Sequence, residues 1–219
     1  MRKTLLGLTF ALGAGFVLAQ PPTPPATNPT PAPAPVAATA AVSEFYPTKK
    51  GSKWVYKAGE VEVTLQAGET DPKTGETKLD TIVLGKSVAS ETVKVTTDGV
   101  YRTKINNSTI DPPVKILELE AKAEGKLVPK PVGTKWTVKS KVLQSDLTGE
   151  FTIAKVETVD IGGVKYANAV IVEGPNFNIA STETKVTYIF APGKGVVKLT
   201  YAIAGNSTSL ELKSFEEGK

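Results

Sequence analysis

Carboxylates, and serines that neighbour lysines, are the side chains of this sequence with the means to do chemistry. The chain of 219 residues has no histidine and no cysteine. That composition removes the usual ligand sets for zinc, copper and haem, and it also removes Ser-His-Asp and Cys-His nucleophile pairs. Paired carboxylates, a Ser-Lys dyad or a calcium site are the chemistry that stays open.

None of these three has the spacing that its chemistry needs. Glu69, Asp71 and Glu76 lie in the stretch GETDPKTGE, which lacks the alternating ligands and the central glycine of an EF-hand loop and indicates a solvated hairpin. Each Ser-Lys pair is adjacent in a strand-like run, where neighbouring side chains point to opposite faces. We therefore expect no catalytic residue, no metal site and no cofactor, and we predict that the protein is not an enzyme.

The first 19 residues read as a secretory leader. Met1-Arg2-Lys3 is cationic, Leu5 to Leu18 is nearly all apolar, and Val17-Leu18-Ala19 supplies the small residues that a signal peptidase recognises. The apolar run is shorter than a bilayer span, and no later run is longer. We expect cleavage after Ala19, no transmembrane segment in the mature chain, and a soluble protein in the periplasm or outside the cell.

Residues 20–42 form a linker rich in proline, alanine and threonine, with no charged residue. Such a segment cannot build a packed core, and it favours an extended polyproline II path. We predict that it is a disordered spacer and that residues 43–219 form the folded domain. The formal net charge of +4 falls by two when Arg2 and Lys3 are removed, so no strong positive field points to nucleic acid.

The domain alternates apolar and polar residues with a period of two, which is typical of half-buried strands. Turn signals separate these runs, and among them Asp98-Gly99 predicts a type I′ hairpin. Ile116 to Leu127 suits a helix by composition and a strand by alternation, and we favour a strand followed by a loop. The pattern predicts an all-β, mainly antiparallel domain in which a strongly curved sheet or incomplete barrel encloses the core.

The two tryptophans occur in similar phrases. Residues 47–57, PTKKGSKWVYK, and residues 129–139, PKPVGTKWTVK, agree at Pro, Gly, Lys, Trp and the final Lys. This repeat predicts two related halves, about 43–128 and 129–219, although turn chemistry repeated by chance is the alternative. The distance from each Trp to the later turn glycine is 45 residues in the first half and 59 in the second. We therefore expect about one extra hairpin in the second half.

Trp54 and Trp136 each stand near a strand start, where a large aromatic side chain is more often core than site. We expect them to be structural anchors of the sheet. The alternative is a ligand platform, in which an aromatic face stacks a sugar while the neighbouring lysines bind an anionic group.

Three segments of the domain resemble a family of small exported bacterial proteins, sometimes labelled TapB-like. The segments are Tyr46 to Tyr56, the strand with Asn168-Ala169-Val170, and Phe190 to Val197. The resemblance implies a lipoprotein-carrier-like fold, in which a curved antiparallel sheet surrounds an apolar groove. Many relatives carry a cysteine after the leader for a lipid anchor, whereas this chain has none.

Two functions from different classes follow as hypotheses for an exported protein of the cell envelope. The first is a carrier that holds an apolar small molecule or lipid on the concave face of the sheet. Its candidate ligand-binding residues are the inward apolar side chains Val63, Leu65, Val95, Tyr188, Phe190, Leu199 and Tyr201. The second is a structural or interaction module that binds an envelope protein or an anionic polysaccharide. An open pocket favours the first, whereas a filled core with an exposed edge or patch favours the second.

Overall fold

The computed structural model describes residues 43–203 and 205–219. The predicted leader and linker lie outside the described residues. Within those residues, no helix has both the length and the apolar character needed to cross a bilayer.

Thirteen strands and one short 3-10 helix make up the part of the chain that is described. Every paired strand is antiparallel to its neighbour. The elements are β1 (Lys53–Ala58), β2 (Val61–Thr70), β3 (Glu76–Val83), β4 (Lys86–Thr96), β5 (Gly99–Ile105), β6 (Ser108–Ala121), η1 (Ala123–Gly125), β7 (Leu127–Pro129), β8 (Lys135–Val142), β9 (Ser145–Ile161), β10 (Val164–Ile179), β11 (Thr182–Ala191), β12 (Gly195–Ile203) and β13 (Asn206–Glu216).

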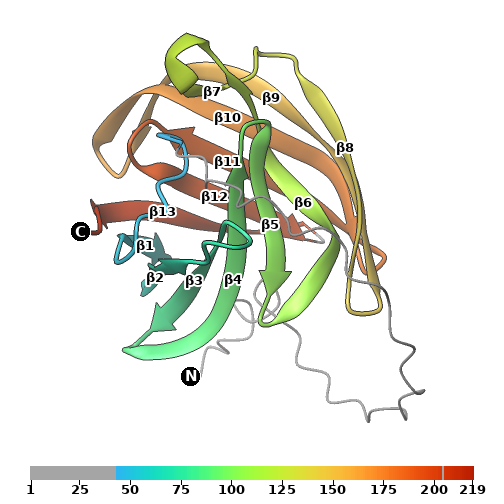
Figure 1. The fold of residues 1–219 in the computed structure, drawn as a ribbon. Coiled ribbons are helices and arrows are strands. Elements are labelled where there is room, and N and C mark those ends of the chain that lie inside the picture. The colour runs from blue at the N-terminus through green and yellow to red at the C-terminus, as the bar shows by residue number, and fades with distance from the viewer. Residues whose placement is uncertain (1–42, 204) are drawn as a thin grey trace, which may run out of the picture.

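Twelve of the strands close into a barrel (Figure 1). The strand order is β5-β4-β3-β2-β1-β13-β12-β11-β10-β9-β8-β6, and β5 also pairs with β6, which completes the ring. β7 adds to the free edge of β6 outside the ring. The all-β, antiparallel prediction is confirmed, but the barrel is closed where we expected a curved sheet or incomplete barrel. Closure follows from the β5–β6 hairpin, because it joins the edge of the first run of strands to the strand that pairs with β8.

The inward-facing side chains fill the barrel. Aromatic rings form a continuous series across the interior, in which Phe151 contacts Phe177 and Tyr188, and Tyr188 stacks on Phe190 with ring centroids 5.6 Å apart. Phe190 and Val172 are fully buried. The apolar residues that alternate along the strands therefore form the core of the barrel.

Three local predictions meet different outcomes. Ile116 to Leu127 is a strand followed by a short helical turn, as favoured. The hairpin at Asp98-Gly99 forms, but Gly99 pairs with Thr96 as the first residue of β5 and does not have a positive φ, so the turn residues are Thr97 and Asp98. The expected extra hairpin is wrong: four strands, β1–β4 or β8–β11, separate each Trp phrase from its turn glycine. The additional residues instead lengthen β9 and β10, which have 17 and 16 residues.

Candidate functional site

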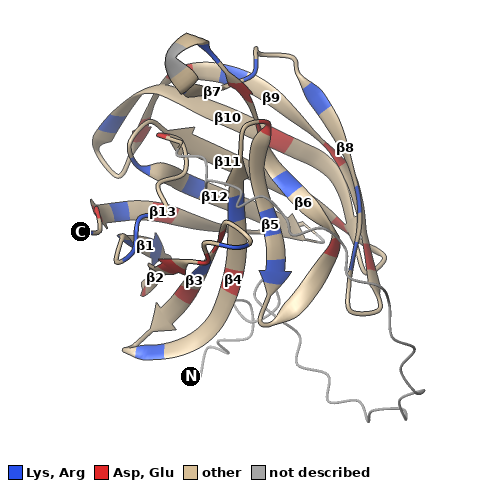
Figure 2. Ribbon diagram, in the orientation of Figure 1, with Lys and Arg blue, Asp and Glu red and all other residues tan. Residues whose placement is uncertain are grey.

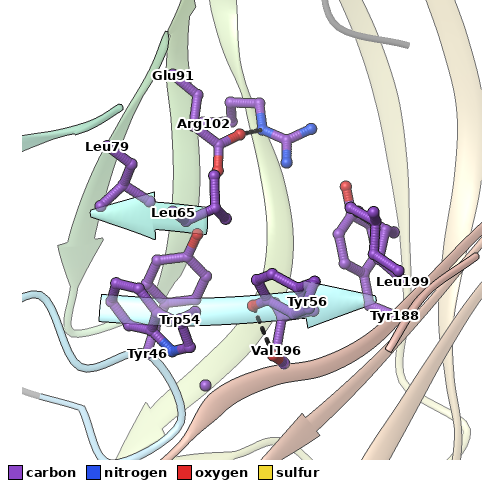
Figure 3. A pocket seen from close by; sticks show the side chains of 12 residues that line it. Tyr46, Trp54, Tyr56, Leu65, Leu79, Glu91, Arg102, Tyr188, Val196 and Leu199 are labelled. Carbon is purple, nitrogen blue, oxygen red and sulfur yellow. Dashed lines mark hydrogen bonds and ion pairs between the residues drawn. The ribbon is translucent and has the colours of Figure 1, made fainter. Parts of the chain in front are cut away.

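The seven predicted ligand-binding residues lie in the barrel, where they are buried or half-buried. Leu65, Tyr188 and Leu199 line a void at the centre (Figure 3), whose volume is about 30 Å³. A void of this volume has room for a few water molecules. The other four pack elsewhere in the core, where Val63, Val95 and Phe190 are buried and Tyr201 is half-buried. The structure thus gathers these residues in a filled interior.

An ion pair borders the same void. Arg102 Nε lies 2.6 Å from Glu91 Oε2, and both side chains are less than one-fifth exposed. Figure 3 shows this pair facing Tyr188 and Leu199 across the void. Burial alone would lower the pKa of Arg102, but the Glu91 carboxylate and the nearby tyrosines together outweigh it and hold that pKa well above its usual range. The guanidinium therefore stays charged at physiological pH.

Three buried tyrosines of the interior have raised pKa values. Burial raises the pKa of Tyr56 well above its usual range, and its hydroxyl donates a hydrogen bond to the carbonyl of Val196 at 2.8 Å. Burial also raises the pKa of Tyr46 and Tyr188. A phenol in this state cannot serve as a base near neutral pH.

The barrel has one weak seam, between β6 and β8. Only two residue pairs join these strands, Ile110 with Val142 and Asp111 with Lys141. Two prolines, Pro112 and Pro113, come next in β6, and neither has an N–H to donate to β8. The backbone ladder therefore ends at Asp111.

Side chains of β8 bridge the seam where the ladder stops. The indole Nε1 of Trp136 donates to the carbonyl of Lys115 at 2.9 Å, and Ser140 Oγ donates to the carbonyl of Pro112. These two bonds hold β6 close to β8 without regular pairing. The seam is thus closed by side chains along a stretch where the rest of the ring is closed by backbone.

A groove of about 250 Å³ runs along this seam. Its lining combines two aromatic side chains, two prolines and two lysines. The lining residues are Tyr101, Pro112, Pro113, Lys115, Glu118, Trp136, Thr137, Val138 and Lys139. Antiparallel pairing alternates its hydrogen bonds, and Val142 and Ser145 close the two-residue β8–β9 turn, so the amides of Thr137 and Lys139 point away from β9 and toward the seam.

Charges on one wall of the groove are already paired. Lys115 Nζ lies 2.8 Å from Asp98 Oδ2 and 3.0 Å from Glu118 Oε1, and Lys130 Nζ lies 2.6 Å from Glu118 Oε2. The Tyr101 ring lies under Lys115, with the ammonium 5.1 Å from the ring centroid. Lys139 on the opposite wall has no ion-pair partner among the described residues. It is the cation of the groove that is available to a ligand.

Hydrogen bonds shift the pKa values of Asp98 and Lys115 on the wall where the charges are paired. Partial desolvation would raise the pKa of Asp98, but hydrogen bonds from Lys115, Thr96 and Tyr101 outweigh it and hold that pKa well below its usual range. Partial desolvation likewise opposes the charge of Lys115, yet its hydrogen bonds to Asp98, Tyr101 and Glu118 raise its pKa. Both groups are therefore charged across the physiological range.

The two tryptophans differ in their surroundings. Trp54 is buried, donates to the carbonyl of Lys194 at 2.6 Å and packs on Phe215 with ring centroids 5.3 Å apart. Trp136 packs on Phe151 at 5.6 Å in the same way, but it is only half-buried because it borders the groove. Of the two tryptophans, Trp136 is therefore the one whose position fits the ligand-platform alternative.

Sequence reasoning missed most of the groove. It named Trp136 and the lysines near it in the sequence, but not Tyr101 or Lys115, because the pairing of β5 with β6 brings those two residues to the seam. The adjacent prolines were the available signal. Two prolines inside a strand pattern indicate an edge, and here they mark the place where pairing with β8 stops.

Comparison with known proteins supports the fold. No family model and no curated protein matches the sequence. A crystal structure described as a "putative lipoprotein", from Parabacteroides distasonis ATCC 8503, is similar over 78% of this chain and 98% of its own, with 12% identity and a TM-score of 0.51. One described as a "putative exported protein with YmcC-like fold", from Bacteroides fragilis NCTC 9343, covers 80% and 100% with 11% identity and a TM-score of 0.47. The first likeness shows a shared fold, and the TapB-like resemblance stays a prediction.

Proposed function

We propose that this chain is an exported, non-enzymatic protein of the cell envelope that binds an anionic polysaccharide in the seam groove. The observation that carries the proposal is the groove itself, which is lined by the half-buried Trp136 and by Lys139, a lysine with no ion-pair partner among the described residues. The N-terminal leader of the sequence supports export and a soluble mature chain.

Each part of the groove matches one feature of an acidic sugar. An exposed aromatic face suits the C–H face of a pyranose ring, and a lysine suits a carboxylate, sulfate or phosphate group. The seam-facing amides of Thr137 and Lys139 are further donors for such an anion. A volume of about 250 Å³ is below that of most pockets for drug-sized ligands, so a single sugar unit is the size that fits.

The carrier hypothesis has less support. The lumen holds a void of about 30 Å³, so an acyl chain there would need the interior side chains to move apart. We therefore place the ligand at the seam, and we treat a lipid in the lumen as an outcome that the experiment must be able to detect.

The test is a titration of residues 20–219 with an acidic polysaccharide such as alginate and, separately, with a neutral glucan, followed by calorimetry. We expect binding of the acidic polymer alone, and weaker binding at higher salt because exposed charges are screened. Lys139→Ala should reduce affinity about five-fold, in line with the loss of an exposed ion pair worth roughly 1 kcal/mol. Lys185→Ala, an exposed lysine on β11, is the matched control and should bind as the parent does.

Two outcomes contradict the proposal. Equal loss of binding in both lysine variants indicates a diffuse charge effect, and binding of the neutral glucan by all variants indicates another site. An organic extract of the protein purified from its native envelope is the complementary check. A lipid present near one per chain would move the ligand to the lumen.

A further inference from the structure

One end of the barrel carries leucines at positions that a stable turn would give to other residues. In an antiparallel ring, alternate hairpins turn at the same end. Pairing of Ile110 with Val142 fixes this for the two sides of the seam, because residues just before β6 and just after β8 must then lie together. We name the leucine rim as four of the tips at this end, Leu84-Gly85, Asn106-Asn107, Leu143-Gln144 and Ala180-Ser181. Figure 1 shows the β3–β4, β5–β6 and β8–β9 tips projecting on the same side.

Leu84 and Leu143 are highly exposed, at 91% and 65%. Their φ angles are +50° and +57°, in the left-handed region where a branched side chain is strained. The intervening tip has Asn106 and Asn107, the residue type that tolerates this conformation. Neither burial nor turn geometry accounts for the two leucines.

Each of the two leucines has a lysine two positions away in the chain. Lys86 follows Leu84 by two positions and has no ion-pair partner among the described residues. Lys141 precedes Leu143 by two positions and lies 3.6 Å from Asp146 in a pair that is exposed on both sides. Figure 2 shows a basic segment in blue at the start of β4. The Asn106-Asn107 tip, which lies between the two leucines in the ring, has no charged residue.

We propose that the leucine rim docks on an anionic lipid surface, with Leu84 and Leu143 inserted at the boundary between headgroups and acyl chains. Lys86 and Lys141 then lie at the depth of the lipid phosphates, which is the charge complementarity that the surface requires. A rigid protein partner needs a contiguous apolar patch, whereas the two leucines stand on separate tips with a polar tip between them. Fluid acyl chains close around isolated side chains, so lipid is the partner that fits. This inference is independent of the seam groove, which lies at the start of β8 and not at its β9 turn.

The test is co-sedimentation of residues 20–219 with vesicles of phosphatidylcholine and phosphatidylglycerol at roughly 7:3, and with phosphatidylcholine alone. We expect binding to the anionic vesicles and several-fold weaker binding to the neutral ones. The double variant Leu84→Asn/Leu143→Asn should bind the anionic vesicles at least about ten-fold more weakly, because two buried leucines are lost. Its melting temperature should be unchanged or higher, since asparagine accepts a positive φ, and this separates lost docking from lost folding.

Val164→Thr is the matched control, because Val164 is an exposed apolar residue, 49% accessible, beside the β9–β10 turn at the other end of the barrel. It should bind vesicles as the parent does. Three results overturn the proposal: no sedimentation of the parent with anionic vesicles, undiminished binding by the double leucine variant, or an equal loss in the Val164 variant.

Discussion

At the scale of single residues, Trp54 and Trp136 show that one short sequence motif can lie in two different environments. Each indole donates to a carbonyl on another part of the chain, and each ring packs on the phenylalanine directly opposite it in the neighbouring strand. The two tryptophans differ in exposure because their neighbouring strands differ. β13 covers Trp54, whereas the proline-interrupted β6 leaves part of Trp136 open to the groove.

Asp98 gives a prediction about pH. Its folded pKa is held below the ordinary value by bonds from Thr96, Tyr101 and Lys115, so it contributes stability above about pH 4 that is lost as pH falls toward the folded pKa. The side chain is 56% exposed, so solvent screening limits the contribution to about 1 kcal/mol. Asp98→Asn should therefore lower the free energy of unfolding by that amount at pH 7.

Urea unfolding at pH 7 and pH 3 measures this effect. The variant and the parent should differ at pH 7, and the difference should be smaller at pH 3, where the carboxylate contribution has begun to fade. A difference that is the same at both pH values would show that Asp98 acts through packing alone.

The sequence predicted individual core residues better than it predicted the candidate site. Alternation alone placed Val95, Tyr188 and Phe190 in the interior, because burial of alternate side chains is a local property of a strand. Lys115 and Tyr101 gave no such signal. Their position beside Trp136 depends on the pairing of three strands, which no short stretch of sequence encodes.

At the scale of elements, the long strands β9 and β10 depend on two glycines that make room for aromatic rings. A Cβ on Gly174 would lie 2.5 Å from Phe177 Cε2 and 2.8 Å from Phe151 Cε1, and a Cβ on Gly149 would lie 2.7 Å from Phe177 Cγ. Phe177 and Phe151 are both buried. The rings therefore occupy the space that ordinary strand side chains would take.

Gly174→Ala should consequently destabilise the barrel by roughly 1–3 kcal/mol, because the added methyl group overpacks the core. Gly68→Ala in β2 is the control, since the nearest atom to its new Cβ is the Lys78 carbonyl oxygen at 3.4 Å. Chemical denaturation of the two variants compares them directly. A Gly174 variant as stable as the Gly68 variant would mean that the two rings move aside without cost.

Element types were predictable and element lengths were not. Turn signals and alternation predict the strands. The longer interval in the second half predicts an extra hairpin, whereas the structure has longer strands there. A strand can continue for as long as a neighbour pairs with it, and β9 and β10 pair with each other over most of their length. Only the pairing reveals that limit.

At the scale of the whole molecule, closure of the ring decides where a ligand can go. A curved open sheet would have exposed its concave face, whereas the closed barrel buries that face and leaves an irregular seam between β6 and β8. The sequence indicated curvature but not closure, because closure rests on contacts between strands far apart in the chain. The seam at the start of β8 and the leucine rim at the opposite end are the surfaces that we propose for partners.

Hydrogen exchange along β8, with and without an acidic polysaccharide, tests the central claim that the seam groove is the binding site. In the free protein, the amides of Thr137 and Lys139 should exchange faster than that of Val138, which faces β9. Added polymer should protect Thr137 and Lys139 and leave the lumen-lining strands β2 and β12 unchanged. Protection confined to β2 and β12, or no change at the seam when the polymer is bound, would contradict the account.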